Sequence, residues 1–149
     1  LSDKLGLGEF VEFVGRKSLD EVHSLLRSAA FSVVSSTHET FSVAAAESLM
    51  CGRPVLSTRC GGPEEFLTPE LGRIVESDNV TEMANGLDWM LDHYSEFEPE
   101  ALHEYARERF SPEVVAEQIL GIYSSVLDAD NPRAREATTD NGTSESEPS

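Results

Sequence analysis

The sequence predicts an α/β fold in which helices flank a parallel sheet. Short apolar runs typical of strands alternate along the chain with stretches whose apolar residues recur every three or four positions. This alternation indicates parallel strands joined by crossover helices. The apolar fraction of 39% is large enough for a buried core, so we expect a folded body.

Four segments have the composition of strands. The run of residues 31–36 is nearly continuously apolar, as expected for a strand buried on both faces. Pro54 lies at the start of another run, where a missing N–H donor is tolerated. In chain order, we expect strands at 10–14, which ends at Gly15, and at 31–36, 53–58 and 72–76.

Helix signals fill the segments between and after these strands. Ser18 and Glu21 have the spacing of a capping box, and a periodic apolar face follows, made of Leu19, Val22, Leu25, Leu26 and Ala29. Gly52 closes the next helix, and Ser111 before Pro112 marks the start of the last one. We therefore expect helices at about 41–51, 80–94, 100–109 and 112–127, with a short helical piece at 64–67.

The domain organisation follows from composition. Residues 1–127 predict one folded domain, whereas 128–149 contain mostly Asn, Asp, Ser, Thr, Glu and Pro and predict a disordered acidic tail. The sequence starts at Leu1 rather than Met, and four short strands are few for so many helices. We expect further sequence upstream.

The charge balance restricts the possible partners. The chain carries 28 acidic and 11 basic residues, a formal net charge of -17, which argues against nucleic acid or an anionic membrane surface as a partner. Only Lys4 and Lys17 are lysines, and the other basic residues are arginines. This arginine bias and the excess of acidic residues fit adaptation to high salt and plain solubility about equally well. No apolar stretch has the length of a membrane span, and Cys51 and Cys60 match no disulfide framework, so we expect a cytoplasmic protein. The two cysteines also lack metal-ligand spacing, so we expect no bound metal.

Three loops are candidates for a ligand site, because ligands bind beyond the carboxyl ends of parallel strands. They are the segments 15–17, 38–40 and 60–62. The helix that begins near Phe41 presents free N–H groups and a positive dipole end, which suit a phosphate or diphosphate. Arg16 and Lys17 could add positive charge there.

Two glutamates, Glu39 and Glu47, are the candidate side chains. Glu47 has mostly small or apolar helical neighbours, so we expect it to be buried and paired, either with a ribose diol or with Arg53 or Arg59. Glu39 either contacts a ligand or completes a capping box with Ser36. The Gly61-Gly62 pair is common in turns but also allows a backbone to approach a ligand closely.

Three motifs in order carry a resemblance to a known family. They are the segment 35–43 (SSTHETFSV), the segment 47–55 (ESLMCGRPV) and the segment 61–65 (GGPEE). Together they resemble the donor-binding half of retaining, nucleotide-sugar-dependent glycosyltransferases of the GT-B fold, in the group 1 or family 4 class. The resemblance spans about residues 5–127 and implies a Rossmann-like domain that is incomplete at its N-terminus.

The resemblance implies roles for individual residues. Glu39, the candidate catalytic residue, would contact the hydroxyls of the donor sugar, and Glu47 would hold the ribose. The remaining donor-binding residues would be Phe41, Ser42 and Val43 through their amides, Gly61 and Gly62 along the cleft, and Gly15 and Arg16 in the donor loop. The co-substrate would be a nucleoside diphosphate sugar, with no metal and no other cofactor. The hexose would pass with retention to a hydroxyl of a glycan, lipid or small-molecule acceptor.

Two departures from the family limit this expectation. The family usually has glycine where this chain has Ser42, and the paired arginine and lysine that brace the diphosphate lie on elements that precede this sequence, as does the acceptor domain. We therefore expect the isolated chain to be inactive without an acceptor domain supplied upstream. The alternatives are a catalytically inactive remnant or interaction module of the same fold, a nucleotide-sugar epimerase, and, less favoured, a phosphorylase.

Overall fold

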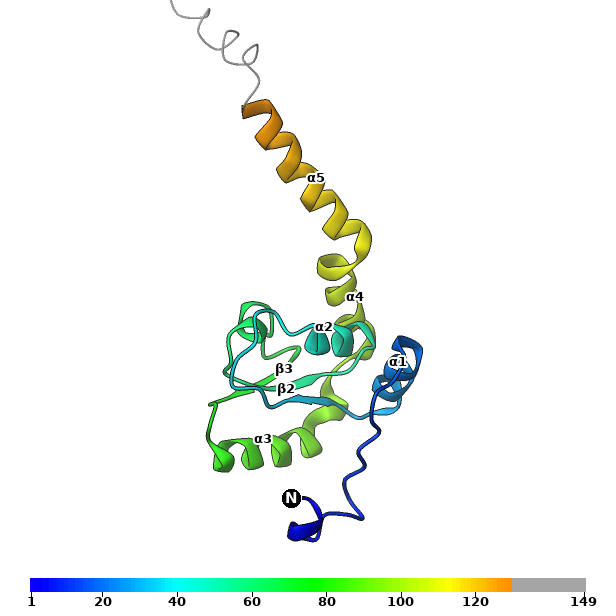
Figure 1. The fold of residues 1–149 in the computed structure, drawn as a ribbon, viewed down its shortest axis with the longest axis vertical. Coiled ribbons are helices and arrows are strands. Elements are labelled where there is room, and N and C mark those ends of the chain that lie inside the picture. Colours follow the sequence, from blue (N-terminus) through cyan, green and yellow to red (C-terminus); the bar gives the residue numbers. More distant parts are fainter. Residues whose placement is uncertain (130–149) are drawn as a thin grey trace, which may run out of the picture. The chain divides into compact units, whose positions relative to one another are not determined.

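The structure, a computed structural model, describes residues 1–129. The chain divides into two compact units, Leu1–Arg107 and a second that begins at Glu108 (Figure 1). The first unit contains the sheet and the helices that pack on it. Among the described residues, no helix is both long enough and apolar enough to cross a bilayer.

A parallel sheet of three strands in the order β1-β2-β3 forms the centre of the first unit. The strands are β1 (Ser32–Val34), β2 (Val55–Thr58) and β3 (Gly72–Val75). Val33 pairs with Leu56, and Leu56 pairs in turn with Arg73. The predicted parallel α/β fold is therefore confirmed.

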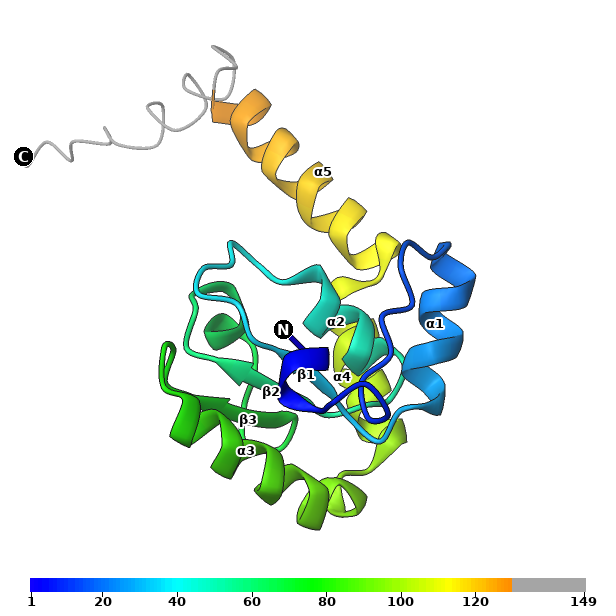
Figure 2. The same ribbon diagram turned by 60° about the horizontal axis from the view of Figure 1, so that its bottom comes forward.

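Two helices cover the two faces of this sheet, as Figures 1 and 2 both show. Helix α2 (Val43–Met50) packs against β1 and β2, and α3 (Val80–His93) packs against β2 and β3. Every residue of β2 is buried, because this central strand has a neighbour on each side and a helix on each face. The core on the α3 face is built on Leu56, Val75 and Met90.

Strand β1 differs from the predicted strand 31–36. It is shorter, it forms one edge of the sheet, and Val33 is 44% exposed. The expectation of burial on both faces was therefore wrong for this strand. An apolar run does not distinguish an edge strand from a central one, because position in the sheet depends on its partners.

The predicted strand at 10–14 does not form. Its residues adopt no regular structure, and Phe10 and Phe13 are 81% and 83% exposed. The N–H groups of Phe10 and Val11 bond back to Leu7 in a local turn instead. A β-prone segment becomes a strand only when another strand offers it a ladder of hydrogen bonds, and no strand pairs with it in the described residues.

Helix α1 (Leu19–Ser28) begins with the predicted capping box. The Glu21 N–H donates to Ser18 Oγ at 3.4 Å, and the Ser18 N–H donates to Glu21 Oε2 at 2.9 Å. The predicted apolar face is less buried than expected, because no residue of this helix is fully buried and Leu19 is 68% exposed.

The remaining elements before α5 are short 3₁₀ turns and one further helix. Gly62–Glu65 form the turn η2, which begins two residues before the predicted helical piece and replaces it. Turns η1 and η3 span Asp3–Leu5 and Tyr94–Glu96, and helix α4 spans Pro99–Phe110.

The second unit contains helix α5 (Pro112–Ala129). Ser111 caps it as predicted, since the Val114 N–H lies 3.5 Å from Ser111 Oγ. The predicted tail begins within this helix, whose end includes residues 128 and 129. The rest of the tail, 130–149, lies outside the described residues.

Candidate functional site

Two of the three predicted loops meet at the carboxyl edge of the sheet. Glu39 and Gly61 form an isolated parallel bridge beyond the ends of β1 and β2. The Glu39 N–H donates to the Cys60 carbonyl at 2.8 Å, and the Gly62 N–H donates to the Glu39 carbonyl at 2.9 Å. The backbone thus places Glu39 directly beside the glycine pair.

Glycines are required in this arrangement because the backbones lie so close. A Cβ on Gly61 would lie 2.7 Å from the Glu39 carbonyl oxygen, and Gly61 also has a φ of 106°. A Cβ on Gly62 would overlap the backbone of Phe41. The pair thus lies directly against the 39–41 loop of the chain itself, and its predicted approach to a ligand stays a prediction.

The predicted contact between Ser36 and Glu39 forms, but it caps no helix. Ser36 Oγ donates to Glu39 Oε1 at 2.6 Å, and residues 35–42 contain no helical turn. Glu39 is half-buried, and no other side chain in residues 1–129 forms a hydrogen bond to its carboxylate. One carboxylate oxygen therefore remains available.

Helix α2 begins at Val43, two residues later than predicted, because Ser42 has a left-handed backbone with a φ of 68°. Its first turn contains no acidic residue and no side chain caps it. The Ala45 and Ala46 N–H groups bond to the Ser42 carbonyl. Within the described chain, the N–H groups of Ser42, Val43 and Ala44 have no hydrogen-bond acceptor. The positive end of this helix is thus uncapped.

The side chains at this helix start differ in exposure. Ser42 is only 5% exposed, and its Oγ has no hydrogen-bond partner among the described residues. Phe41 is 38% exposed, with its ring 5.3 Å from that of Phe66, and Val43 is 62% exposed. A buried hydroxyl without a partner is uncommon in folded proteins and calls for a reason.

Glu47 lies in the middle of α2 and is half-buried, so the expectation that it is buried was wrong. The expected protein partners are engaged elsewhere: Arg53 donates to the Arg27 carbonyl, and Arg59 pairs with Glu64 and Glu76. Across residues 1–129, no hydrogen bond or ion pair engages the Glu47 carboxylate. The salt-bridge alternative for Glu47 is therefore contradicted.

A network that the sequence analysis missed supports the glycine loop. Glu64 Oε1 accepts from the Gly61 N–H at 2.9 Å, and Arg59 Nη1 donates to Glu64 Oε2 at 2.9 Å. Arg59 Nε also donates to Glu76 at 2.8 Å. The Gly61 N–H, with a smaller contribution from Arg59, holds the pKa of Glu64 below its ordinary value. The position of Glu64, three residues after Gly61, could have suggested this contact, since it is the glutamate half of a capping box.

Gly15 and Arg16 lie in the exposed segment before α1. Gly15 has a φ of 65° and open space around it. In the part of the chain that the structure describes, neither residue forms a hydrogen bond or ion pair with the Glu39 or Gly61 loop. Their predicted part in donor binding stays a prediction.

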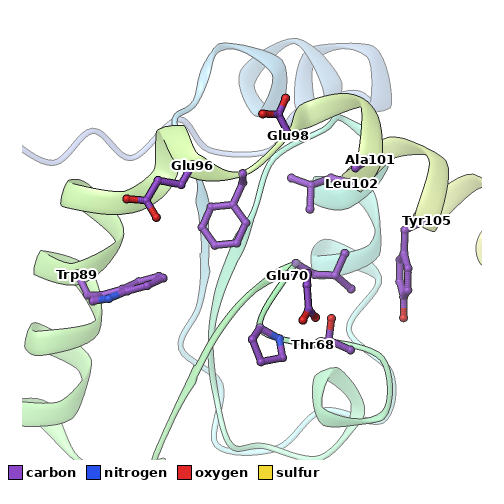
Figure 3. A pocket seen from close by; sticks show the side chains of 11 residues that line it. Thr68, Glu70, Trp89, Glu96, Glu98, Ala101, Leu102 and Tyr105 are labelled. Carbon is purple, nitrogen blue, oxygen red and sulfur yellow. The ribbon is translucent and has the colours of Figure 1, made fainter.

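A cavity of about 750 Å³ lies near the amino-terminal end of β3, where residues 68–71 lead into that strand. Trp89 from α3 and Tyr105 from α4 stand on opposite sides of it, and Glu70, Glu96 and Glu98 lie around it (Figure 3). The Trp89 and His93 rings are stacked with their centres 4.4 Å apart, and the Arg73 guanidinium carbon lies 4.7 Å from the Trp89 ring centre. None of the predicted site residues lines this cavity.

Comparisons with known proteins identify the family of this chain. The family described as "Glycosyl transferases group 1" matches residues 1–109. An α-(1→4)-mannosyltransferase of Mycolicibacterium hassiacum is 31% identical over 130 residues, which cover 83% of this chain and 31% of that protein. An uncharacterized glycosyltransferase of Methanocaldococcus jannaschii is 39% identical over 74 residues, covering 49% of this chain and 21% of that protein.

Solved structures show the same fold. Sucrose-phosphate synthase from Thermosynechococcus elongatus matches 87% of this chain and 33% of its own, with a TM-score of 0.78 and 26% identity. The Anabaena protein HepE, solved in complex with UDP-glucose, matches 83% of this chain and 35% of its own, with a TM-score of 0.74 and 23% identity. The chain thus spans between 21% and 35% of the length of these relatives. On the family match over residues 1–109, this chain belongs to the group 1 glycosyltransferases.

Proposed function

We propose that this chain is the donor-binding part of a retaining glycosyltransferase that transfers a hexose from a nucleoside diphosphate sugar to an acceptor hydroxyl. The observation that carries the proposal is the uncapped start of α2. In the sequence it lies between Glu39, which has one carboxylate oxygen free, and Glu47, whose carboxylate has no partner in residues 1–129. Its free N–H groups suit a diphosphate. Carboxylates suit the hydroxyls of a sugar and a ribose, because each oxygen accepts hydrogen bonds.

In this proposal each group has one role. The N–H groups of Ser42, Val43 and Ala44 hold the diphosphate, Glu47 accepts from the ribose hydroxyls, and Glu39 accepts from the hydroxyls of the transferred sugar. The acceptor oxygen forms a bond to the anomeric carbon as the bond from that carbon to the diphosphate oxygen breaks. The proton of the acceptor hydroxyl passes to the leaving diphosphate, which departs from the same face, so the configuration is retained.

The acceptor site is proposed to lie outside this chain, in an N-terminal domain like the part of the relatives that this chain does not cover. The free N–H groups would supply electrostatic stabilisation of the leaving diphosphate. We propose that no metal takes part. On this basis the isolated chain binds a donor but does not turn it over.

Titration of the full chain with a panel of nucleotide sugars tests this function. The panel is UDP-glucose, UDP-N-acetylglucosamine, GDP-mannose and ADP-glucose, and binding is measured by calorimetry. We expect one member to bind, and Glu47→Gln to weaken that binding about tenfold, because glutamine has one acceptor oxygen in place of two and carries no charge.

Asp88→Asn is the matched control, since it makes the same charge change at an exposed position of α3, on the other face of the sheet. It should leave the affinity unchanged. Equal weakening by the two variants, or no binding by the parent chain to any member of the panel, would contradict the proposal.

The second candidate, a remnant that has lost donor binding, is favoured by one observation. Ser42 adds a side chain and a strained backbone where the family usually has glycine. If the parent chain binds none of the four nucleotide sugars but Ser42→Gly binds one, the remnant is the correct assignment.

A further inference from the structure

The two chain segments that lead to the Glu39–Gly61 bridge are unequal in length. From the last ladder pair, Val34 with Ser57, the first segment advances five residues to Glu39 and the second advances four to Gly61. Residues 35–38 belong to no strand, and the extra residue between the two pairs must be accommodated by a bend, as in a β-bulge, which changes the direction in which side chains point. The direction of Glu39 therefore depends on how this longer segment is held.

Thr58 holds the longer segment from the neighbouring strand. It is the last residue of β2, is 6% exposed, and its hydroxyl donates to the Ser36 carbonyl. The Val34 carbonyl lies 3.3 Å from the same hydroxyl. A threonine hydroxyl has one hydrogen to donate, so the two carbonyls share it. A single buried side chain thus fixes the backbone on both sides of Ser35.

Ser36 connects this fixed backbone to the carboxylate. Its hydroxyl donates to Glu39 Oε1 at 2.6 Å, a length typical of a hydrogen bond to a charged acceptor. A glutamate side chain has three rotatable bonds and would otherwise sample many orientations. With Oε1 engaged, Oε2 has one defined direction.

We propose that Ser36 is a positioning residue that holds Glu39 in the orientation needed to contact the transferred sugar, and that Thr58 supports it. The inference rests on the proposed function, in which Glu39 contacts the sugar and not the nucleotide. Orientation before binding removes an ordering cost that the donor would otherwise meet. Ser36 therefore contributes to affinity for the sugar portion only.

Two probes separate the sugar from the nucleotide. UDP-glucose and UDP are titrated against the full chain and against Ser36→Ala by calorimetry. We expect the variant to bind UDP-glucose about fivefold more weakly and UDP equally well, which reduces the ratio of the two affinities. Ser36→Thr keeps the hydroxyl and should restore the ratio, whereas Thr58→Val should reduce it.

Ser35→Ala is the matched control, because Ser35 is the exposed neighbour of Ser36 and its side chain forms no hydrogen bond in residues 1–129. It should leave both affinities unchanged. A Ser36→Ala variant that weakens UDP and UDP-glucose equally has a general structural defect, and that result would overturn the inference.

Glu39→Gln separates a failure of this inference from a failure of the proposed function. If Glu39→Gln lowers the ratio and Ser36→Ala does not, Glu39 acts without Ser36, and only the inference fails. If Glu39→Gln also leaves the ratio unchanged, the proposed sugar contact fails.

If the chain binds neither UDP-glucose nor UDP, the positioning role of Ser36 can be tested without a ligand. NMR relaxation of the Glu39 side-chain methylenes should show greater motion in Ser36→Ala than in Ser35→Ala. Equal motion in the two variants would refute the positioning role whatever the donor is.

Discussion

Ser42 combines two local features that each oppose folding. A left-handed backbone at a residue with a Cβ costs about 1 kcal/mol relative to the right-handed regions, and an unpaired buried hydroxyl adds a desolvation cost of about the same size or more. Sites that break local rules are often functional, because a ligand rather than the fold accounts for them. The position of Ser42 at the uncapped start of α2 fits that pattern.

We expect Ser42→Gly to raise the free energy of unfolding by about 1 kcal/mol, since glycine removes both the backbone strain and the unpaired hydroxyl. Urea denaturation followed by circular dichroism measures this. Asp78→Gly is the control: Asp78 also has a positive φ, of 55°, but its side chain is exposed, so its gain should be smaller. A destabilised Ser42→Gly would show that the hydroxyl has a structural partner.

Glu64 makes the glycine loop sensitive to pH. Its pKa is lowered, chiefly by the Gly61 N–H, so its contribution to loop stability is present above the pKa of an unfolded glutamate. That contribution is lost as the pH falls through the lowered pKa of the folded state. We expect the Gly61 amide resonance in an NMR titration to move in this acidic range.

Glu64→Gln provides the comparison for this titration, because glutamine keeps an acceptor oxygen but does not titrate. The Gly61 resonance should then stay constant over the same range. Movement of equal size in the variant would assign the titration to another group.

The register of the sheet depends on Gly72, the first residue of β3. A Cβ at this position would overlap the backbone of Val55, the first residue of β2. No flexible side chain can move away to make room, so the two strands themselves must separate. Strand pairing at this end of the sheet therefore requires glycine.

Gly72→Ala should lower the free energy of unfolding by about 3 kcal/mol, because the overlap forces a backbone shift within the core. Hydrogen exchange should show lost protection at the amides of β2 and β3. Gly121→Ala, at a helical position of α5 with open space around it, is the control and should not destabilise. Unchanged protection in Gly72→Ala would mean that the strands accommodate a methyl group.

The sequence predicted those features that depend on neighbouring residues along the chain. The Ser18 capping box, the Ser111 cap and the order of strands and helices are of this kind, since each depends on residues within one turn or one run. The strand at 10–14 and the burial of β1 could not be predicted, because both depend on which strands lie alongside.

For the candidate site, the motifs identified Glu39, Glu47 and the glycine pair, and the structure brings Glu39 and the pair into direct contact. The predicted start of α2 was wrong by two residues, because nothing in the sequence indicates that Ser42 adopts a left-handed backbone. The contact between Arg59 and Glu76 could not be inferred from spacing, because it depends on the pairing of β2 with β3, which brings the ends of the two strands together.

The whole molecule carries a formal net charge of -17, far from neutrality. Self-repulsion of this size opposes the compact state and is screened by salt. This repulsion gives a physical test of the hypothesis that the chain is adapted to high salt.

We expect the midpoint of thermal unfolding to rise by about 5 °C between 0.05 M and 1 M KCl, as screened repulsion favours the folded state. Sucrose at matched osmolality is the control for effects that do not depend on charge. A midpoint that stays constant or falls in KCl would contradict the hypothesis.

Trp89 is the only tryptophan in the chain, and its ring contacts His93 of α3 and Arg73 of β3 but none of the candidate site residues in the described part of the chain. Its intrinsic fluorescence will therefore report the integrity of α3 and β3 and will be nearly silent to occupancy of the candidate site. The same emission provides an internal standard: a variant near Glu39 that keeps the parent spectrum has kept the packing of α3 on β3, whatever happens to its affinity.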